Sequence, residues 1–319
     1  MIKWLATVLL VCAPLLAQAQ TYPSKPVRIF VTIGPGAAGD ILARIIGDEL
    51  SKRMGQPFII ENRAGAGGNI AGEAAAKSPP DGYAFLLASS STHGVNPSIY
   101  TRMPFDPIKD FVPVGLVAGN PNVLVVAPTL PVQSLKDLVE LARQKPGELT
   151  FASGGSGTSM HMSGEMLNWL ANVKMTHIPY KSTPQAVTAV MAGDVTMTYA
   201  SVPVVIAQVK AGKLKALGVT SLKPLASWPD LPTLAGQGYP ELEASAWFGF
   251  AAPAGTPEAI VNRMNAELQQ VLSTPSVRER LLAQGMEALG GSPAEFGSFI
   301  RSEIERWSRV VKATGAKVN

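Results

Sequence analysis

The hydrophobic positions of this chain form short apolar runs that alternate with longer amphipathic segments. Residues 27–33, 58–61 and 84–88 are runs of strand length, and residues 40–50 place apolar side chains at helical spacing. Short strands separated by helices indicate parallel pairing through right-handed crossovers. The pattern therefore predicts an α/β fold.

Capping residues mark several helix boundaries. Ser134 is a candidate N-cap, and Thr256 precedes a proline suited to the first helical position. Ser292 and Glu295 form a capping-box pattern that opens a long final helix, and Gly315 ends it. Apolar and aromatic positions recur at helical spacing in this last segment, so we expect them to belong to the core.

The middle of the chain has its own set of strand and helix signals. We expect a second α/β lobe inserted into the first, with strands at residues 123–127, 149–152, 175–178, 195–200 and 215–220. The chain would cross between lobes twice and form a hinge, beside which ligands bind in such folds. The predicted organisation is lobe one at 20–122, lobe two at 123–246 and a return to lobe one at 247–319.

The first residues have the pattern of an export signal. A basic residue precedes the apolar run 4–11, which is too short for a permanent membrane span, and residues 17–19 form a small-x-small cleavage pattern. A lipoprotein would need Cys12 as the acylated residue, but Val11 stands where a small residue is required. We therefore expect residues 1–19 to be a cleaved signal peptide and the mature protein to be periplasmic.

Composition excludes several classes of function. Cys12 is the only cysteine, so the mature chain has no disulfide, thiolate metal site or cysteine nucleophile. The chain carries 27 basic and 23 acidic side chains without a basic run, so we expect no nucleic-acid partner. His93, His161 and His177 lack the spacing of a metal motif, and we expect neither a metal nor a cofactor.

The glycine loop at residues 34–39 follows the first strand and opens the first helix. It fits the dinucleotide fingerprint G-x-G-x-x-G, and Glu61 lies about 20 residues further on. Against a nicotinamide-dependent oxidoreductase, Asp40 would occupy the N–H groups that should hold a pyrophosphate. With Asp40 capping its own helix, the loop suits a carboxylate instead. Taken alone, the loop also fits a tight turn that binds nothing.

Two further donor-rich turns follow predicted strands. One is Ser-Ser-Ser-Thr-His-Gly at residues 89–94, and the other is Ser-Gly-Gly-Ser-Gly-Thr-Ser at residues 153–159. The second lacks the lysine of a P-loop and the last glycine of G-x-S-x-G, so Ser156 is a poor nucleophile. His161 suits a ligand contact and a first-turn cap equally well. Three such turns at the carboxyl ends of strands predict a binding site without catalytic residues.

With these residues assembled, the mature chain resembles the Bug-type (Bordetella uptake gene) receptors of tripartite tricarboxylate transporters. The resemblance rests on ordered blocks at residues 35–44, 61–69, 79–83, 96–100, 179–181, 211–214, 247–249 and 252–257. It implies a type II-like periplasmic binding protein with two lobes, each a mixed, mainly parallel sheet flanked by helices. Such a receptor is a monomer and not an enzyme. It hands a small organic mono- or dicarboxylate to a membrane permease or, alternatively, reports ligand occupancy to a membrane sensor.

The resemblance also implies site residues, because in that family the first glycine loop holds a carboxylate and the other two turns complete the cleft. This chain departs from the family pattern at Ile33, Ala37, Gly39, Ser182 and residues 199–201. The last departure removes an acidic or amide residue, which favours a simple or aromatic carboxylate. The ligand-binding residues implied are Ile33, Gly36, Ala37, Ala38, Gly39, Asp40, Ser89, Ser90, Ser91, Thr92, Ser153, Gly154, Gly155, Ser156, Gly157, Thr158, Ser159, His161, Tyr199, Ala200 and Ser201.

Overall fold

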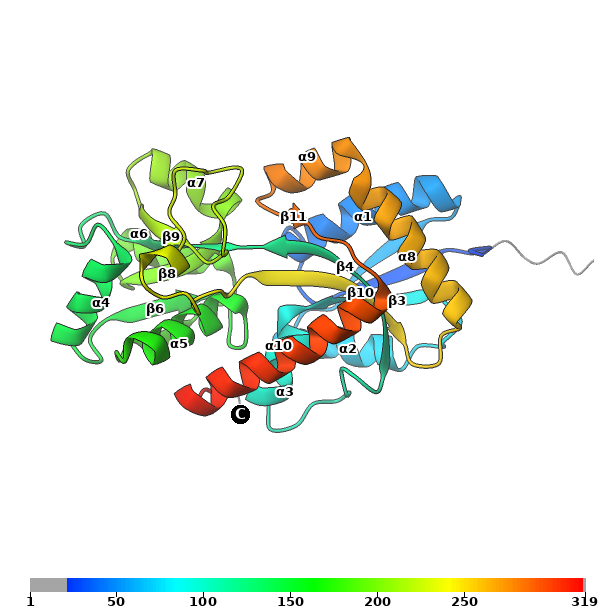
Figure 1. Cartoon of the computed structure of the whole chain (residues 1–319), viewed down its shortest axis with the longest axis horizontal. Coiled ribbons are helices and arrows are strands. Elements are labelled where there is room, and N and C mark those ends of the chain that lie inside the picture. The colour runs from blue at the N-terminus through cyan, green and yellow to red at the C-terminus, as the bar shows by residue number, and fades with distance from the viewer. Residues whose placement is uncertain (1–21, 318–319) are drawn as a thin grey trace, which may run out of the picture.

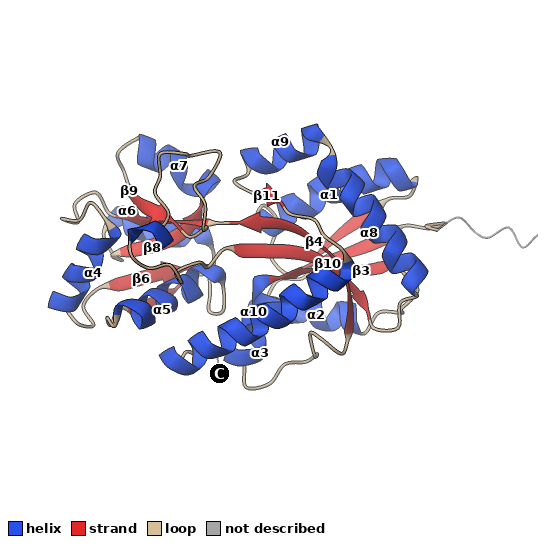
Figure 2. Cartoon of the chain, in the orientation of Figure 1, coloured by secondary structure: helices blue, strands red, loops and turns tan. Residues whose placement is uncertain are grey.

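The computed structural model describes residues 22–317, which fold around two β-sheets flanked by helices (Figures 1 and 2). The signal peptide predicted at residues 1–19 lies outside the described residues. Within the described part, no helix is both long enough and apolar enough to cross a membrane.

The first sheet has the strand order β11-β4-β10-β3-β1-β2. β1 pairs in parallel with β2 and β3, whereas β10 runs antiparallel to β3 and β4. The first three strands thus follow the predicted crossovers, although β1 ends two residues earlier than expected. The bounds are β1 (Val27–Val31), β2 (Phe58–Asn62), β3 (Ala84–Ser89), β4 (Phe111–Asn120), β10 (Ala246–Pro253) and β11 (Glu287–Ala288).

The second sheet has the order β7-β6-β8-β5-β9. β6 pairs in parallel with β7 and β8, and β5 is antiparallel to β8 and β9. The prediction of mixed sheets is confirmed, but more strand pairs are antiparallel than we expected. The strands next to the crossings, β4, β5 and β10, run antiparallel to their neighbours. The bounds are β5 (Asn122–Val126), β6 (Thr150–Ser153), β7 (Thr176–Pro179), β8 (Met197–Ser201) and β9 (Lys215–Val219).

Helices cover both sheets, and most predicted caps are confirmed. Ser134 accepts a hydrogen bond from the Asp137 N–H (3.1 Å), and Ser292 forms the capping box. Thr256 is not the cap we expected, because its hydroxyl donates to the Pro253 carbonyl (2.7 Å). The helices are α1 (Ala38–Met54), α2 (Asn69–Ala76), α3 (Asn96–Ile99), α4 (Leu135–Gln144), α5 (Ser159–Ala171), α6 (Thr183–Ala192), α7 (Val202–Lys210), α8 (Glu258–Ser273), α9 (Pro275–Ala283) and α10 (Pro293–Thr314), with a π-helical turn η2 (Ser91–Val95) and the 3-10 turns η1 (Ala66–Gly68) and η3 (Ala235–Gln237).

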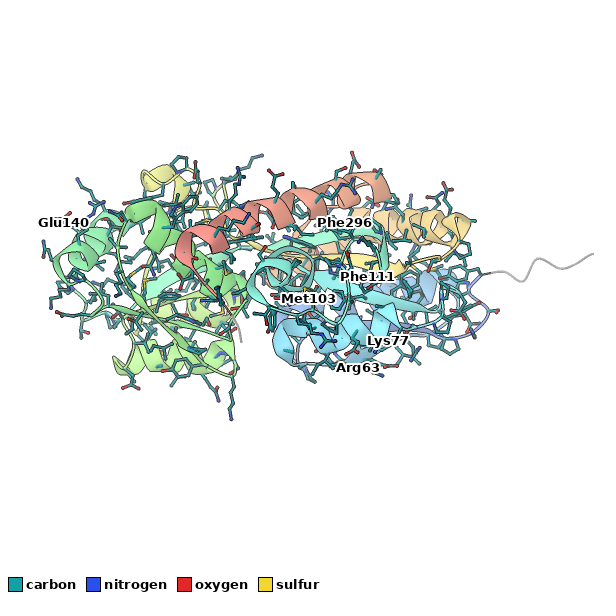
Figure 3. The ribbon with its side chains drawn as sticks, turned by 90° about the horizontal axis from the view of Figure 1, so that it is seen from below. Arg63, Lys77, Met103, Phe111, Glu140 and Phe296 are labelled. Atoms are coloured by element: carbon teal, nitrogen blue, oxygen red, sulfur yellow. The ribbon has the colours of Figure 1, made fainter. Side chains whose placement is uncertain are left out.

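The chain passes between the two sheets at the ends of β4 and β10. β4 ends at Asn120 and β5 begins at Asn122, while β10 begins at Ala246 directly opposite Asn120. The long helix α10 packs on β4 of the first sheet and on α5, which covers the second sheet (Figures 1 and 3). Phe296 near its start packs on the first sheet, and Trp307 near its end belongs to the core of the second. α10 therefore connects the two cores beside the crossing.

Candidate ligand site between the two sheets

Asp40 is the centre of the first glycine loop. Its carboxylate accepts hydrogen bonds from the Gly36 N–H (2.9 Å), from Asn62 Nδ2 (2.9 Å) and from the Arg44 guanidinium (2.9 and 3.0 Å), and only 2% of Asp40 is exposed. Burial alone would raise the pKa of Asp40, but the hydrogen bonds from Arg44, Gly36 and Asn62 lower it overall. Asp40 is therefore ionised, its charge is balanced by Arg44, and it holds the loop in place through the Gly36 N–H.

The start of α1 has no side-chain cap among residues 22–317. The helix begins at Ala38, and its N-cap Ala37 has no side chain that could accept a hydrogen bond. Asp40 is thus the third residue of α1 and not its N-cap, which corrects the sequence expectation. Because the first N–H groups of a helix lack intrahelical acceptors, those of Ala38 and Gly39 suit an anion.

Gly39 is required by close packing beside this loop. A Cβ atom at Gly39 would lie 2.9 Å from Cε1 of Phe248 and 3.0 Å from Cδ1 of Ile33. Phe248 stands on β10, so the loop is pressed against the strand that returns from the second sheet. Ile33, which we predicted to contact ligand, packs beside Gly39 and against the core cluster that contains Phe248.

The serine-rich turn after β3 is held by its own hydroxyls and reaches the second glycine loop. Ser89, Ser90 and Thr92 are buried, and Thr92 Oγ1 accepts a hydrogen bond from the Ser89 N–H (3.1 Å). Ser91 Oγ donates to the Gly157 carbonyl (3.2 Å). Ser91 therefore joins turns that belong to different sheets.

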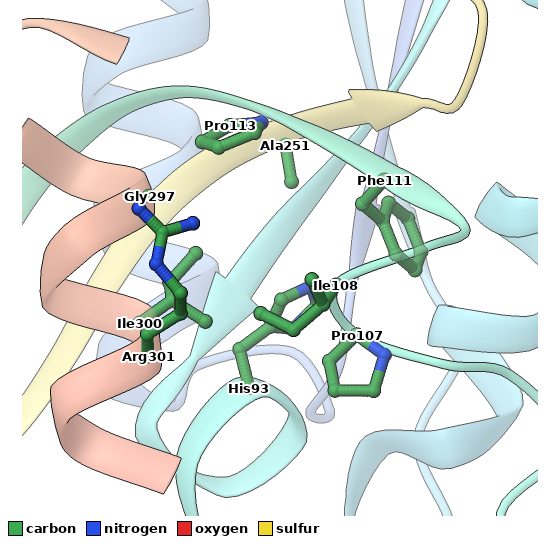
Figure 4. Close-up of a pocket in the computed structure, with 9 residues that line it drawn as sticks. All are labelled: His93, Pro107, Ile108, Phe111, Pro113, Ala251, Gly297, Ile300 and Arg301. Atoms are coloured by element: carbon green, nitrogen blue, oxygen red, sulfur yellow. The ribbon is translucent and has the colours of Figure 1, made fainter. Parts of the chain in front are cut away.

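A small pocket lies behind the serine-rich turn, between β4 and α10 (Figure 4). Its volume is about 40 Å³, which suits water molecules better than an organic ligand. His93 in its wall is fully buried, with Nδ1 3.0 Å from Thr92 Oγ1. Burial lowers the pKa of His93 to about 3, so the imidazole stays neutral and supports Thr92.

The second glycine loop is ordered by two stacked histidines. The Gly157 N–H donates to Nδ1 of His161 (3.1 Å), and Ser153 Oγ lies 2.7 Å from Nε2 of His177. The two imidazole rings stack with centroids 3.9 Å apart. Burial and the neighbouring His161 lower the pKa of His177 to about 3. His161 thus holds the loop through Nδ1, the N-cap of α5 is Thr158, and the ligand contact of His161 stays a prediction.

The remaining residues of this loop surround the start of α5. Thr158 is the N-cap and accepts a hydrogen bond from the His161 N–H (3.4 Å). Gly155 N–H donates to Ser153 Oγ (3.1 Å), and Gly154, Ser156 and Ser159 are half-buried. The loop carries four hydroxyls, as the sequence predicts, and two of them, those of Ser153 and Thr158, stabilise the loop itself.

Residues 199–201 form the end of β8, in line with the strand predicted at 195–200. Tyr199 and Ala200 are fully buried in the core of the second sheet, and Ser201 precedes α7. Burial raises the pKa of Tyr199, and its hydroxyl has no hydrogen-bond partner within residues 22–317.

The glycine-rich turn at residues 65–68 was missing from the predicted site. A Cβ atom at Gly68 would lie 2.8 Å from side-chain atoms of both Thr32 and Thr92, so this turn abuts the serine-rich turn. Asn96 Nδ2 donates to the Gly67 carbonyl (3.0 Å), and a Cβ at Gly157 would lie 3.2 Å from Asn96 Oδ1. All four residues of this turn have positive φ, a conformation that glycine adopts most easily. The run Gly-Ala-Gly-Gly was therefore the feature of the sequence that could have indicated this turn.

Two asparagines at the crossing were also missed. Asn122 Nδ2 donates to Ser159 Oγ (3.0 Å), and Asn120 is buried beside it in the chain. The two asparagines flank Pro121 between apolar strand residues, and this polar interruption was the only signal for them in the sequence. No group of three or more His, Cys, Asp or Glu side chains in the described part of the chain is placed to hold a metal ion.

The arrangement is closely similar to that of known solute receptors. BugT of Bordetella pertussis is 37% identical over 301 residues, which covers 94% of this chain and 92% of BugT. An R. palustris protein solved with adipate is 37% identical with a TM-score of 0.85, covering 92% of this chain and 98% of that one. MatC of Rhodopseudomonas palustris, solved with malate, is 31% identical with a TM-score of 0.82, covering 91% of this chain and 100% of MatC.

A family model agrees with these likenesses and covers most of the chain. Residues 42–316 match the model described as tripartite tricarboxylate transporter family receptor. Members of this family and the structural neighbours are solute-binding receptors and not enzymes, which confirms the predicted class and removes the oxidoreductase alternative. The chain belongs to the receptor family of the tripartite tricarboxylate transporters.

Proposed function

We propose that this protein is a periplasmic receptor that binds a small organic mono- or dicarboxylate between its two lobes and delivers it to a tripartite permease. The observation that carries the proposal is the start of α1, which no side chain of the described residues caps, so that the N–H groups of Ala38 and Gly39 suit an anion. Asp40 does not repel an anion there, because Arg44 neutralises it. The neighbours solved with adipate and malate support a carboxylate ligand.

Each of the three turns would contact a different part of the ligand. The start of α1 would hold one carboxylate end, and the turns at 89–92 and 153–159 would close on the rest of the ligand. Ser91 and Gly157, which already meet across the two sheets, would bring these turns together. We also propose that the lobes divide at 122/123 and 246/247, that residues 1–19 direct export, and that the receptor acts as a monomer.

A thermal-shift screen of organic acids against the ligand-free mature protein tests this function. A carboxylate present at about 100 times its dissociation constant is expected to add about 2.7 kcal/mol to the free energy of unfolding. The proposal fails if sugars, amines or other solutes without a carboxylate raise the melting temperature while no carboxylate does. Isothermal titration calorimetry of the best acid then gives its affinity and stoichiometry.

A further inference from the structure

Asn120, the last residue of β4, is a buried polar residue with an unsatisfied oxygen. Only 4% of the residue is exposed, and its Oδ1 is buried without a hydrogen-bond partner among residues 22–317. Buried polar atoms are nearly always paired in folded proteins, so each exception needs a physical reason. An acceptor left open beside a binding site is explained if the ligand supplies the donor.

The strand pairing places Asn120 on the side of the first glycine loop. Asn120 lies opposite Ala246, and two residues earlier Ala118 lies opposite Phe248. Directly paired residues, and residues two apart on one strand, share a face of a sheet. Asn120 therefore shares its face with Phe248, whose ring packs against Gly39 at the start of α1.

The next polar residue along the chain approaches the second glycine loop. Asn122 Nδ2 donates to Ser159 Oγ (3.0 Å), and the Asn122 N–H donates to Thr220 Oγ1 (2.9 Å). Ser159 is the first residue of α5, directly after the second loop. Asn120 thus lies on the face that borders the first glycine loop, two residues before an asparagine that bonds to the start of α5. The side chain of Asn122 is bonded through Nδ2, whereas Asn120 Oδ1 has no partner among the described residues.

We infer that Asn120 Oδ1 accepts a hydrogen bond from a hydroxyl group on the bound carboxylate, so that the ligand class is hydroxycarboxylates. This inference rests on the proposed carboxylate-binding function. An ionised carboxylate has only acceptor atoms and cannot satisfy Oδ1, so the donor comes from another ligand group.

The choice of hydroxyl over ammonium follows from the charges nearby. A buried ammonium needs a carboxylate partner. Asp40 beside the first loop is already paired with Arg44, and Glu165 beside the second loop lies 3.5 Å from His161 Nε2. The expectation of a simple or aromatic carboxylate rested on the missing amide at residues 199–201, and Asn120 supplies an amide from a different strand.

Matched ligand pairs test the inference on the unmodified mature protein. Calorimetric titrations compare malate with succinate, 2-hydroxyadipate with adipate, and lactate with propionate. A site built to hydrogen-bond a hydroxyl leaves a buried group unpaired with the analogue that lacks it, so the hydroxylated member of the bound pair should bind at least about tenfold more tightly. Equal or tighter binding of the unsubstituted acid, or tighter binding of aspartate or 2-aminoadipate, overturns the inference and leaves carboxylate binding intact. If no carboxylate binds, the proposed function itself fails.

Two leucine variants separate a ligand contact from a structural role. Asn120→Leu removes the oxygen at similar volume, so it should reduce the affinity ratio of the pair to about one without lowering the melting temperature of the ligand-free protein. Asn122→Leu is the matched control, because it breaks the bond to Ser159. It should lower the melting temperature and weaken both acids equally. If Asn120→Leu behaves like the control, Asn120 is structural and the inference is overturned.

Discussion

The two faces of β10 at the crossing differ in how their polar neighbours are paired. On the α10 face, Trp247 Nε1 donates to Glu303 Oε2 (2.8 Å), and Trp307 Nε1 donates to the same oxygen (3.0 Å). Arg306 connects Glu303 (2.9 Å) with Glu243 (2.7 Å) in the returning segment. On the loop face, Asn120 Oδ1 has no partner among the described residues.

This difference suggests that one face of β4 and β10 serves stability and the opposite face serves ligand binding. Alternate residues of a strand point to opposite faces, so Trp247 contributes to a buried network while its neighbour Phe248 borders the first glycine loop. The bonded network on the α10 face stabilises the crossing, although one donor atom, Arg306 Nη2, is buried without a partner among the described residues. On the loop face the buried atom without a partner is an acceptor, Asn120 Oδ1, which leaves capacity for a ligand. Substitutions on the α10 face should therefore change stability most, and substitutions on the loop face should change binding.

Glu303→Ala should have the largest effect. It leaves Arg306 and two buried indole N–H groups without their acceptor, and removing one partner of a buried ion pair costs about 3–5 kcal/mol. Urea unfolding at neutral pH measures the loss. Glu305→Ala is the control, because Glu305 is exposed on the same helix and should change the free energy of unfolding by less than about 0.5 kcal/mol. Equal effects of the two variants would contradict the importance of the network.

Gly39→Ala should have a smaller effect on stability and a clear one on binding. The added Cβ would meet Phe248 and Ile33, and such overpacking costs about 1–3 kcal/mol. Displacement of the loop should also weaken carboxylate affinity, which calorimetry measures. In Gly34→Ala the new Cβ would have no atom within 4 Å, so this control should keep both stability and affinity. A Gly39→Ala protein that binds normally would show that the start of α1 is not part of the site.

Ser91→Ala should have the smallest effect. It removes the hydrogen bond to the Gly157 carbonyl, and such a bond contributes about 1 kcal/mol. Thermal unfolding and ligand titration together measure the change. Ser302→Ala, which removes a hydroxyl bonded only within α10, is the comparison. If Ser91→Ala changes neither stability nor affinity, the contact between the two turns is unimportant.

Much of the fold could be predicted because local patterns determine it. Hydrophobic runs located β1 to β3 and β5 to β9 but not β4, β10 or β11, and the side chains of Ser134 and Ser292 cap helices as expected. Thr256 has the residue type of a cap, but its hydroxyl bonds to the Pro253 carbonyl before the helix begins. The antiparallel pairing of β10 with β3 and β4 depends on contacts distant in sequence, which no local pattern encodes.

Only those parts of the candidate site that consist of backbone groups in glycine- or serine-rich turns could be predicted from the sequence. Glycine-rich turns after strands are visible in the sequence, and the structure joins two of them through Ser91 and Gly157. The roles of His161 and Asn120 depend on which partners the tertiary structure provides. The N–H of Gly157 occupies His161 Nδ1, whereas Asn120 Oδ1 is left open among the described residues.

A crystal structure of the mature protein with its tightest-binding hydroxycarboxylate tests the central claim most directly. The account predicts one ligand carboxylate on the N–H groups of Ala38 and Gly39, and the ligand hydroxyl within about 3 Å of Asn120 Oδ1. A ligand bound elsewhere, or one whose hydroxyl points away from Asn120, would contradict it.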